Sequence, residues 1–222
     1  MYHLSLGQQC GLLREASLES YLSSKEPRKV EPSLVHFHAT IDVGTKQCHG
    51  YIAGLRKAVP TQDVVLTAPD CVAAHANPAS VKVNGVAAQS IEANKITPHL
   101  TLIKLPRNNV LSEQQLPCPY TPGETIIPED SACLVIEATS KGLTAKRAEF
   151  FEDCDDSFLE GDKDAFVMTC VKDRKADTVA NSSSAIICQE NGKWYLTHVK
   201  HQEMDDFALY INVGYAMSDP RL

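Results

Sequence analysis

The sequence predicts an all-β fold arranged as two β-barrels. Ten short runs rich in Val, Ile, Leu and Thr follow one another after residue 33. Pro, Gly, Asn or Asp separates these runs, and no long helical period lies between them. Short strands at this spacing, without helices between them, are typical of β-sandwiches and β-barrels.

The runs fall into two groups of similar size. The first group is LVHFHATI (34–41), CHGYIAGL (48–55), DVVLTA (63–68), ASVKVNGV (79–86) and HLTLIKL (99–105). The second group is ACLVIEAT (132–139), AFVMTCV (165–171), SAIICQ (184–189), KWYLTHV (193–199) and ALYINVGY (208–215). The polar, proline-bearing link SEQQLPCPYTPGE (112–124) separates them. We expect a first barrel at 30–115 and a second barrel at 120–213.

Residues 1–29 have a different character from the rest. This part is polar and ends in SSKEPRK, and its segment REASLESYLSS is long enough only for a short helix, which would be marginal in water by itself. We interpret 1–29 as an arm tied down by Cys10. The first residues have no cationic start and only a short apolar stretch, so they predict a mature or truncated chain and not a secretory signal.

Composition limits the partners and the compartment. The 222 residues carry a net charge of -7, which gives no reason to bind nucleic acid or an anionic membrane. No window has the length of apolar sequence that a membrane span needs. Eight cysteines are spread along the chain without a C-x-x-C pair, which favours disulfides and a secreted, extracellular protein over buried thiols in the cytosol.

Several segments, taken in order, resemble the trypsin/chymotrypsin-like serine proteases. VVLTAPDC (64–71) resembles the family's WVLTAAHC block, HLTLIKL resembles DIALLKL, and NSSSAIIC (181–188) stands where the family has DSGGPLVC. CHGYIAG resembles CGGSLI, and GKWYL with ALYINVGY resembles the last strands. The series covers residues 33–215, although none of its motifs is intact. The resemblance implies two six-stranded antiparallel β-barrels, chymotrypsin-like, followed by a short C-terminal helix.

The same resemblance implies four disulfides. Three are common in the family and would pair Cys48 with Cys71, Cys154 with Cys170, and Cys133 with Cys188. Cys10 and Cys118 match the bridge by which some members keep their propeptide attached. The family's bridge across the specificity pocket has no counterpart, because Thr178 stands before the serine block and no cysteine lies between Val199 and Leu209.

The catalytic positions of the family do not carry its triad here. Asp70 stands at the position of the histidine base, His99 at that of the orienting aspartate, and Ser182 at that of the nucleophile. A serine hydroxyl needs an acceptor with a pKa near 7, whereas an Asp carboxylate starts at about 3.9 and accepts its proton poorly. Loss of the base alone is expected to cost about 10⁴ to 10⁶ in turnover. The resemblance therefore implies a catalytically inactive homologue.

Other working parts of the family are replaced as well. Ala180 stands at the oxyanion-hole glycine, and Asn181, a neutral amide, stands at the aspartate that pairs with the new N-terminus after activation. Lys200-His201-Gln202 replaces the substrate-pairing SWG, and Glu31-Pro32 stands where the activation sequence has glycines. Asn181-Ser182-Ser183 is also a sequon, so we expect a glycan on Asn181 that would occlude the former cleft.

Metal, cofactor and residual-enzyme alternatives have weaker support. His36 with His38, on one face of a strand, and His198 with His201 are candidate ligands, but two ligands without a third carboxylate or thiolate make a weak site. The acidic run 149–164 lacks the spacing of an EF-hand, and its simplest interpretation is a solvated loop around Cys154. His75 would be the base of a relocated triad only if its loop turned back into the cleft. We expect no metal and no cofactor.

The sequence thus predicts an inactive serine protease homologue, or pseudoprotease, that acts by binding proteins. By analogy with such homologues, it would be a cofactor, scaffold or regulator of an extracellular proteolytic cascade of the innate immunity or coagulation type, with proteases or recognition proteins as partners. Two alternatives stay open. One is an active serine endopeptidase with a rearranged triad, and the other is a protein that captures a non-protein ligand.

Overall fold

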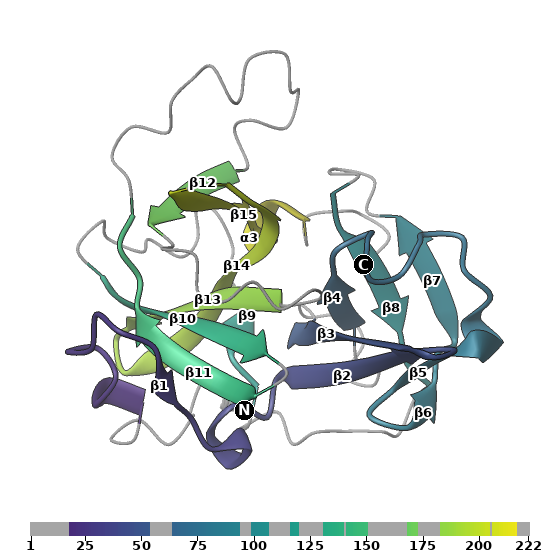
Figure 1. The fold of residues 1–222 in the computed structure, drawn as a ribbon, viewed down its shortest axis with the longest axis horizontal. Helices are drawn as coiled ribbons and strands as arrows, with labels where there is room; N and C mark the ends of the chain where they lie inside the picture. The colour runs from purple at the N-terminus through teal and green to yellow at the C-terminus, as the bar shows by residue number, and fades with distance from the viewer. Residues whose placement is uncertain are drawn as a thin grey trace, which may run out of the picture.

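A computed structural model describes most of the strand-forming sequence. The described residues are 18–53, 64–93, 99–106, 116–119, 131–139, 141–150, 168–172, 183–204 and 206–216. These residues form two antiparallel sheets that lie beside each other, as Figure 1 shows. The predicted all-β class is confirmed.

One sheet, sheet A, is built mainly from the second half of the chain. Its order is β1-β11-β10-β13-β14-β15-β12, and β9 pairs with β14 in parallel. Its strands are β1 (Arg28–Lys29), β9 (Cys118–Pro119), β10 (Ala132–Thr139), β11 (Gly142–Arg147), β12 (Met168–Lys172), β13 (Ser183–Glu190), β14 (Lys193–Glu203) and β15 (Phe207–Asn212).

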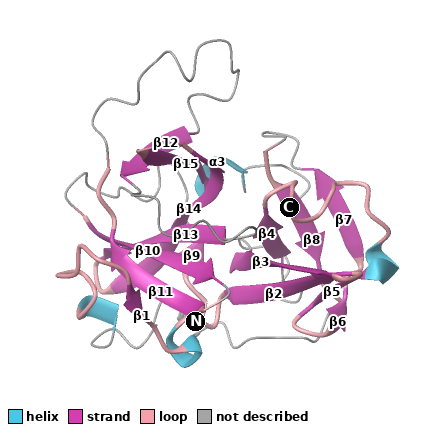
Figure 2. Cartoon of the chain, viewed as in Figure 1, coloured by secondary structure: helices cyan, strands magenta, loops and turns pink. Residues whose placement is uncertain are grey.

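The other sheet, sheet B, is built from the first half. Its order is β6-β5-β2-β3-β4-β8-β7. Its strands are β2 (His38–Val43), β3 (Lys46–Ala53), β4 (Val64–Thr67), β5 (Val81–Val83), β6 (Val86–Ala87), β7 (Ser90–Ala93) and β8 (Thr101–Lys104). Helical structure is confined in the described ranges to short turns, including η1 (Pro32–Leu34), η2 (Pro78–Ser80) and α3 (Val213–Ala216), shown in cyan in Figure 2.

Six strands of each sheet share most of their neighbour pairings. In sheet B the chain order β2, β3, β4, β5, β7, β8 gives the neighbours β5-β2-β3-β4-β8-β7. In sheet A the corresponding strands, β10 to β15, have the order β11-β10-β13-β14-β15-β12. The two orders differ in one pairing, because β13 pairs with β14 in sheet A, whereas β11 and the strand after it, β12, are not partners there. A bridge between Phe150 and Val171 brings the chain after β11 against β12, so sheet A curls back on itself.

The strand numbers differ from the expectation of six per barrel. The described residues form an eight-stranded sheet and a seven-stranded sheet, because β1, β6 and β9, each two residues long, add to the six-strand units. The C-terminal helix of the prediction corresponds to the single turn α3. Part of the N-terminal arm is described too: β1 pairs with β11, and Leu18 is fully buried.

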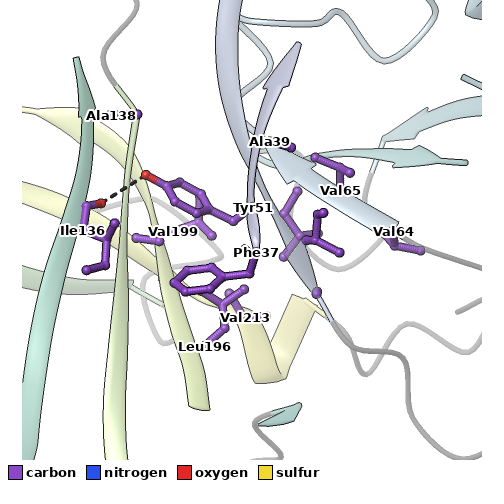
Figure 3. Close-up of a cluster of buried hydrophobic side chains, with 14 of the residues drawn as sticks. Phe37, Ala39, Tyr51, Val64, Val65, Ile136, Ala138, Leu196, Val199 and Val213 are labelled. Carbon is purple, nitrogen blue, oxygen red and sulfur yellow. Dashed lines mark hydrogen bonds between the residues drawn. The ribbon is translucent and has the colours of Figure 1, made fainter. Parts of the chain in front are cut away.

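The hydrophobic core is shared by the two sheets. Phe37 and Tyr51 of the first half lie in one cluster with Leu196, Val199 and Val213 of the second half, as Figure 3 shows. Trp194, the single tryptophan of the sequence, is also fully buried in this cluster. Because burial of apolar area is the main favourable contribution to folding, this shared cluster holds the sheets together.

Gly50 on β3 allows the closest approach within sheet B. A Cβ atom at this position would lie 2.8 Å from the carbonyl oxygen of Leu66, 2.8 Å from Cγ1 of Val65 and 2.9 Å from Cδ1 of Ile41. Real Cβ atoms do not tolerate contacts this short. Only glycine therefore lets β3 pack against β4 and β2 in the observed way.

Two of the four expected disulfides lie within the described residues, and both are formed. Cys48 is bonded to Cys71, and Cys133 is bonded to Cys188 across the directly paired strands β10 and β13. Cys118 and Cys170 are also disulfide-bonded, and the partners expected for them, Cys10 and Cys154, lie outside the described residues. The disulfides are consistent with an extracellular location. Within the described ranges, no helix has the length and apolar character needed to cross a membrane.

Candidate functional site

The positions expected for the base and its orienter follow and precede two paired strands of sheet B. Thr67, the last residue of β4, pairs with Thr101, the first residue of β8. Asp70 lies three residues after Thr67, and His99 lies two residues before Thr101. Since the strands are antiparallel, the chain that leaves β4 and the chain that enters β8 lie at the same edge of the sheet.

Side-chain hydrogen bonds and a disulfide fix the loop after β4. The hydroxyl of Thr101 donates to the carbonyl oxygen of Val72 at 2.8 Å. The neighbouring Cys71 is bonded to Cys48 of β3. Asp70 itself is exposed, and its carbonyl oxygen accepts a hydrogen bond from Nζ of Lys46. The carboxylate of Asp70 is therefore at the surface of a well-anchored loop.

The imidazole of His99 contacts a residue of the other sheet. Its ring centroid lies 4.2 Å from that of His201 on β14, and the two ring planes are inclined by 46°. The preceding residue on β14, Lys200, has a buried side chain whose Nζ lies 3.6 Å from a carboxylate oxygen of Glu203. His201 thus brings a side chain of sheet A against the segment that enters β8 of sheet B, whereas the ion pair of Lys200 stays within β14.

The remaining positions that the resemblance assigns to the catalytic site come just before β13 in the sequence. Ala180, Asn181 and Ser182 are outside the described residues, and so is the expected glycosylation of Asn181. Ser183, the next described residue, has a carbonyl oxygen that accepts a hydrogen bond from the hydroxyl of Tyr51 at 2.8 Å. The next side chain, Ser184, is buried and hydrogen-bonded to the hydroxyl of Tyr210 at 2.7 Å.

Tyr51, which sequence reasoning missed, lies at the contact between the two sheets. It belongs to β3 of sheet B, yet its hydroxyl also reaches the carbonyl oxygen of Ile136 on β10 of sheet A at 3.0 Å, drawn in Figure 3. Its side chain is fully buried, and burial raises the pKa of the phenol further above its ordinary value. The hydroxyl therefore acts as a hydrogen-bond donor that links the two sheets.

A pair of histidines lies next to Tyr51. Nε2 of His38 and Nδ1 of His49 are 3.2 Å apart, and the centroid of the His38 ring is 6.0 Å from that of the Tyr51 ring. Burial, and then the neighbouring His49, lower the pKa of His38 to about 4. Burial also lowers the pKa of His49. Both imidazoles are therefore neutral near pH 7.

The structure separates the histidine pairs that the sequence offered as metal ligands. His36 lies in a turn before β2, and His38 contacts His49 instead. On β14, a register shift between Lys200 and Gln202 interrupts the regular alternation. His198 is hydrogen-bonded to the hydroxyls of Thr169 and Thr197, whereas His201 contacts His99. No group of three or more His, Cys, Asp or Glu side chains suited to a metal occurs among the described residues.

His75, the alternative base, is exposed in a turn after Cys71. Most of the acidic run 149–164 lies outside the described residues, as does Thr178. His198 is partly buried, and desolvation lowers its pKa to about 4.

The chain matches no known protein-family model and no curated protein sequence.

Proposed function

We propose that this chain is a catalytically inactive homologue of the trypsin/chymotrypsin-like serine proteases and that it acts by binding other proteins. In this proposal the two six-strand units are the two barrels of that family. The neighbour pairings that the two units share and the disulfides Cys48–Cys71 and Cys133–Cys188 support the assignment, because the resemblance implies both bridges.

One observation carries the inactive part of the proposal. The imidazole at the former acid position, His99, packs against His201 at the joint of the sheets, and the former base position holds the exposed carboxylate of Asp70. Serine catalysis needs an imidazole between a carboxylate and the hydroxyl, in that order. With the two residue types exchanged, the hydroxyl of Ser182 has a poor proton acceptor in front of it.

The binding part of the proposal follows from what remains of the site. The loop after β4 is held by the hydrogen bond from Thr101 and by the disulfide Cys48–Cys71. In this proposal it is a fixed surface loop that lacks the groups needed for peptide-bond cleavage. Loops on a rigid scaffold are the usual place for recognition. The proposed partners are proteases or recognition proteins of an extracellular cascade, and this last step rests on the resemblance alone.

A fluorophosphonate probe tests the inactive part. We expect no labelling of the purified chain and no cleavage of a broad peptide mixture, with an active trypsin-like protease as the positive control. The matched variant is Ser182→Ala, which removes the only hydroxyl at the nucleophile position. Labelling of the natural chain that disappears in Ser182→Ala would establish an active enzyme and overturn the proposal.

Affinity capture from the source fluid tests the binding part. The bait is the folded chain, and the matched control is the same chain with its disulfides reduced and alkylated. We expect the folded chain to retain a protease or a cascade recognition protein that the control does not retain. Recovery of a small organic ligand, with no protein, would favour the ligand-capture alternative instead.

A further inference from the structure

Positive charge is concentrated in two short segments of this acidic chain. Residues 25–29 (KEPRK) and 141–147 (KGLTAKR) hold six of the 21 Lys and Arg residues and one of the 28 Asp and Glu residues. Six positive charges and one negative charge give these two segments a net charge of +5. Because the whole chain carries -7, the rest of it carries -12.

The fold brings these two segments side by side, although they are far apart in the sequence. Arg28 and Lys29 form β1, which pairs with β11, as Figure 1 shows. The backbone N–H of Arg147 donates to the carbonyl oxygen of Ser24 at 2.8 Å, directly before Lys25. β1 is the terminal strand in the order of sheet A. The two segments therefore form one basic ribbon, residues 25–29 with 141–147, at the end of that sheet.

Most of the charge of the basic ribbon is at the surface. Lys146 is half-buried, and the other five cations are exposed: Lys25, Arg28, Lys29, Lys141 and Arg147. Glu26 is exposed beside them and offsets one positive charge. Successive residues of a strand point to opposite faces of its sheet, so Arg28 and Lys29 present their charges on opposite sides of the ribbon.

This placement favours a linear polyanion over a flat anionic surface. A lipid bilayer would reach the cations on one side of the ribbon only, whereas a flexible chain can follow the edge and contact both sides. An acidic peptide would draw its affinity from backbone pairing and side-chain pockets as well as from charge. Exposed Lys and Arg side chains offer charge above all, which suits a polymer with a dense series of anionic groups.

From this arrangement we propose that the basic ribbon binds a sulfated polysaccharide. Sulfate groups keep their negative charge at any physiological pH, and Lys and Arg are the usual partners of such oxyanions. Sulfated polysaccharides occur outside cells, the compartment with which the disulfides are consistent. The ribbon lies in sheet A and is separate from the loop after β4, so this proposal does not depend on the proposed protease homology.

Calorimetric titration of the full, disulfide-bonded chain with heparin over a series of salt concentrations tests the proposal. Each cation that neutralises a polyanion releases condensed counterions, so the slope of log K against log salt counts the contacts. Five exposed cations less one carboxylate give about four contacts and a slope of about -3, or a loss of about sixtyfold between about 50 and about 200 mM salt. Heparin stripped of its sulfates should not bind.

Paired variants locate the binding. Lys29→Gln with Arg147→Gln should halve the slope and weaken heparin binding at least about tenfold in about 0.1 M salt, because two of about four contacts are lost. The matched control, Lys29→Arg with Arg147→Lys, keeps both charges and should bind like the natural chain. Lys82→Gln, which removes an exposed cation of sheet B, should also bind normally.

Three results would overturn the proposal. The first is absence of heparin binding at about 50 mM salt. The second is an equal loss of affinity in Lys82→Gln or in the charge-retaining double variant, because the ribbon would then not be the site. The third is tighter binding to phosphatidylserine vesicles or to polyglutamate than to heparin, because the ribbon would then be a surface for a membrane or for an acidic peptide.

Discussion

Each sheet holds one histidine whose pKa burial lowers to about 4, but the two have different partners. His198 in sheet A lies between the hydroxyls of Thr169 and Thr197, at 3.3 Å and 2.9 Å. His38 in sheet B faces a second imidazole, that of His49. Similar pKa values therefore arise in two different chemical settings, from desolvation alone at His198 and from desolvation together with the neighbouring His49 at His38.

The difference shows how the hydrogen-bond partners of a neutral imidazole determine which of its two nitrogens carries the proton. The hydroxyl of Thr197 donates to the carbonyl oxygen of Ile186 at 3.1 Å, so its oxygen is free to accept from Nδ1 of His198. Nε2 of His198 then accepts from Thr169. Both ring nitrogens are used, and the tautomer is fixed. In the His38–His49 pair the proton can sit on either ring, so the tautomer is not fixed in the same way.

The largest expected effect is acid destabilisation through His198. Its pKa in the folded chain, about 4, is below the ordinary 6.5 of the unfolded chain. The unfolded state therefore binds the proton first, so the contribution is fully present above pH 6.5 and is lost as the pH falls from about 6.5 to about 4. We expect a loss of about 2–3 kcal/mol over this window, measured as the free energy of unfolding by urea at a series of pH values.

The variant His198→Gln separates this effect from the titration of carboxylates. It has no titratable group at the site, so its curve of stability against pH should be flatter than that of the natural chain between about pH 6.5 and 4. Exposed His75→Gln is the control and should keep the natural slope. Parallel curves for His198→Gln and the natural chain would show that burial of His198 does not set the acid response.

Gly50→Ala tests whether a destabilising substitution in sheet B also lowers the stability of sheet A. The added Cβ would meet the Leu66 carbonyl oxygen at 2.8 Å, so we expect a loss of about 2–3 kcal/mol through overpacking. Trp194 reports on sheet A by fluorescence, and circular dichroism reports on both sheets. Because the core is shared, both signals should shift to the same lower urea midpoint.

Gly85→Ala is the matched control for Gly50→Ala. A Cβ atom at Gly85 meets nothing within 4 Å, although its φ of +84° makes alanine strained there. The expected cost is about 1 kcal/mol, from the backbone alone. Two separate transitions in Gly50→Ala, with fluorescence unchanged, would mean that the sheets unfold independently.

Tyr51→Phe tests the hydrogen bonds between the two sheets, next to the His38–His49 pair. The change removes the hydroxyl that bonds to the carbonyl oxygens of Ile136 and Ser183, and it leaves two acceptors in a buried place. We expect a loss of about 1–3 kcal/mol in the free energy of unfolding. Tyr21→Phe, whose hydroxyl bonds to the Lys29 carbonyl at an exposed position, should cost clearly less. Equal costs would argue against a special role for the joint.

The sequence predicted the strands that are rich in branched apolar residues and missed those that are not. It placed runs at β2, β3, β4, β5, β8, β10, β12, β13, β14 and β15. It missed β11, Gly142–Arg147, in which only Leu143 and Ala145 are buried. It also missed β7, Ser90–Ala93, where Ile91 alone is buried. Both are held by their neighbours in the sheet, which a single sequence does not display.

The positions that the resemblance assigns to the base and its orienter were more accessible to sequence reasoning than the histidine pair. Asp70 and His99 were found because they stand in motifs, and pairing of β4 with β8 brings their segments to one edge. His49 was missed because its importance depends on strand register. The signal was present in Gly44, which has a φ of +61° in the two-residue turn between β2 and β3. That turn fixes which residues of β3 lie beside His38, and hence places His49 there.

The smallest expected effect tests the fixed tautomer of His198. Thr169→Val removes the hydroxyl that donates to Nε2 and keeps the shape of the side chain, so a partly buried acceptor loses its donor. We expect a loss of about 1 kcal/mol in the free energy of unfolding, since the bond at 3.3 Å is a long one. The ¹⁵N signals should still show a proton on Nδ1, because Thr197 keeps its own bond to Ile186 and continues to accept from that nitrogen. If Thr169→Val instead moved the proton to Nε2, Thr169 would be the residue that fixes the tautomer. The tautomer of His198, which distinguishes it from the His38–His49 pair, would then depend on one hydroxyl instead of two.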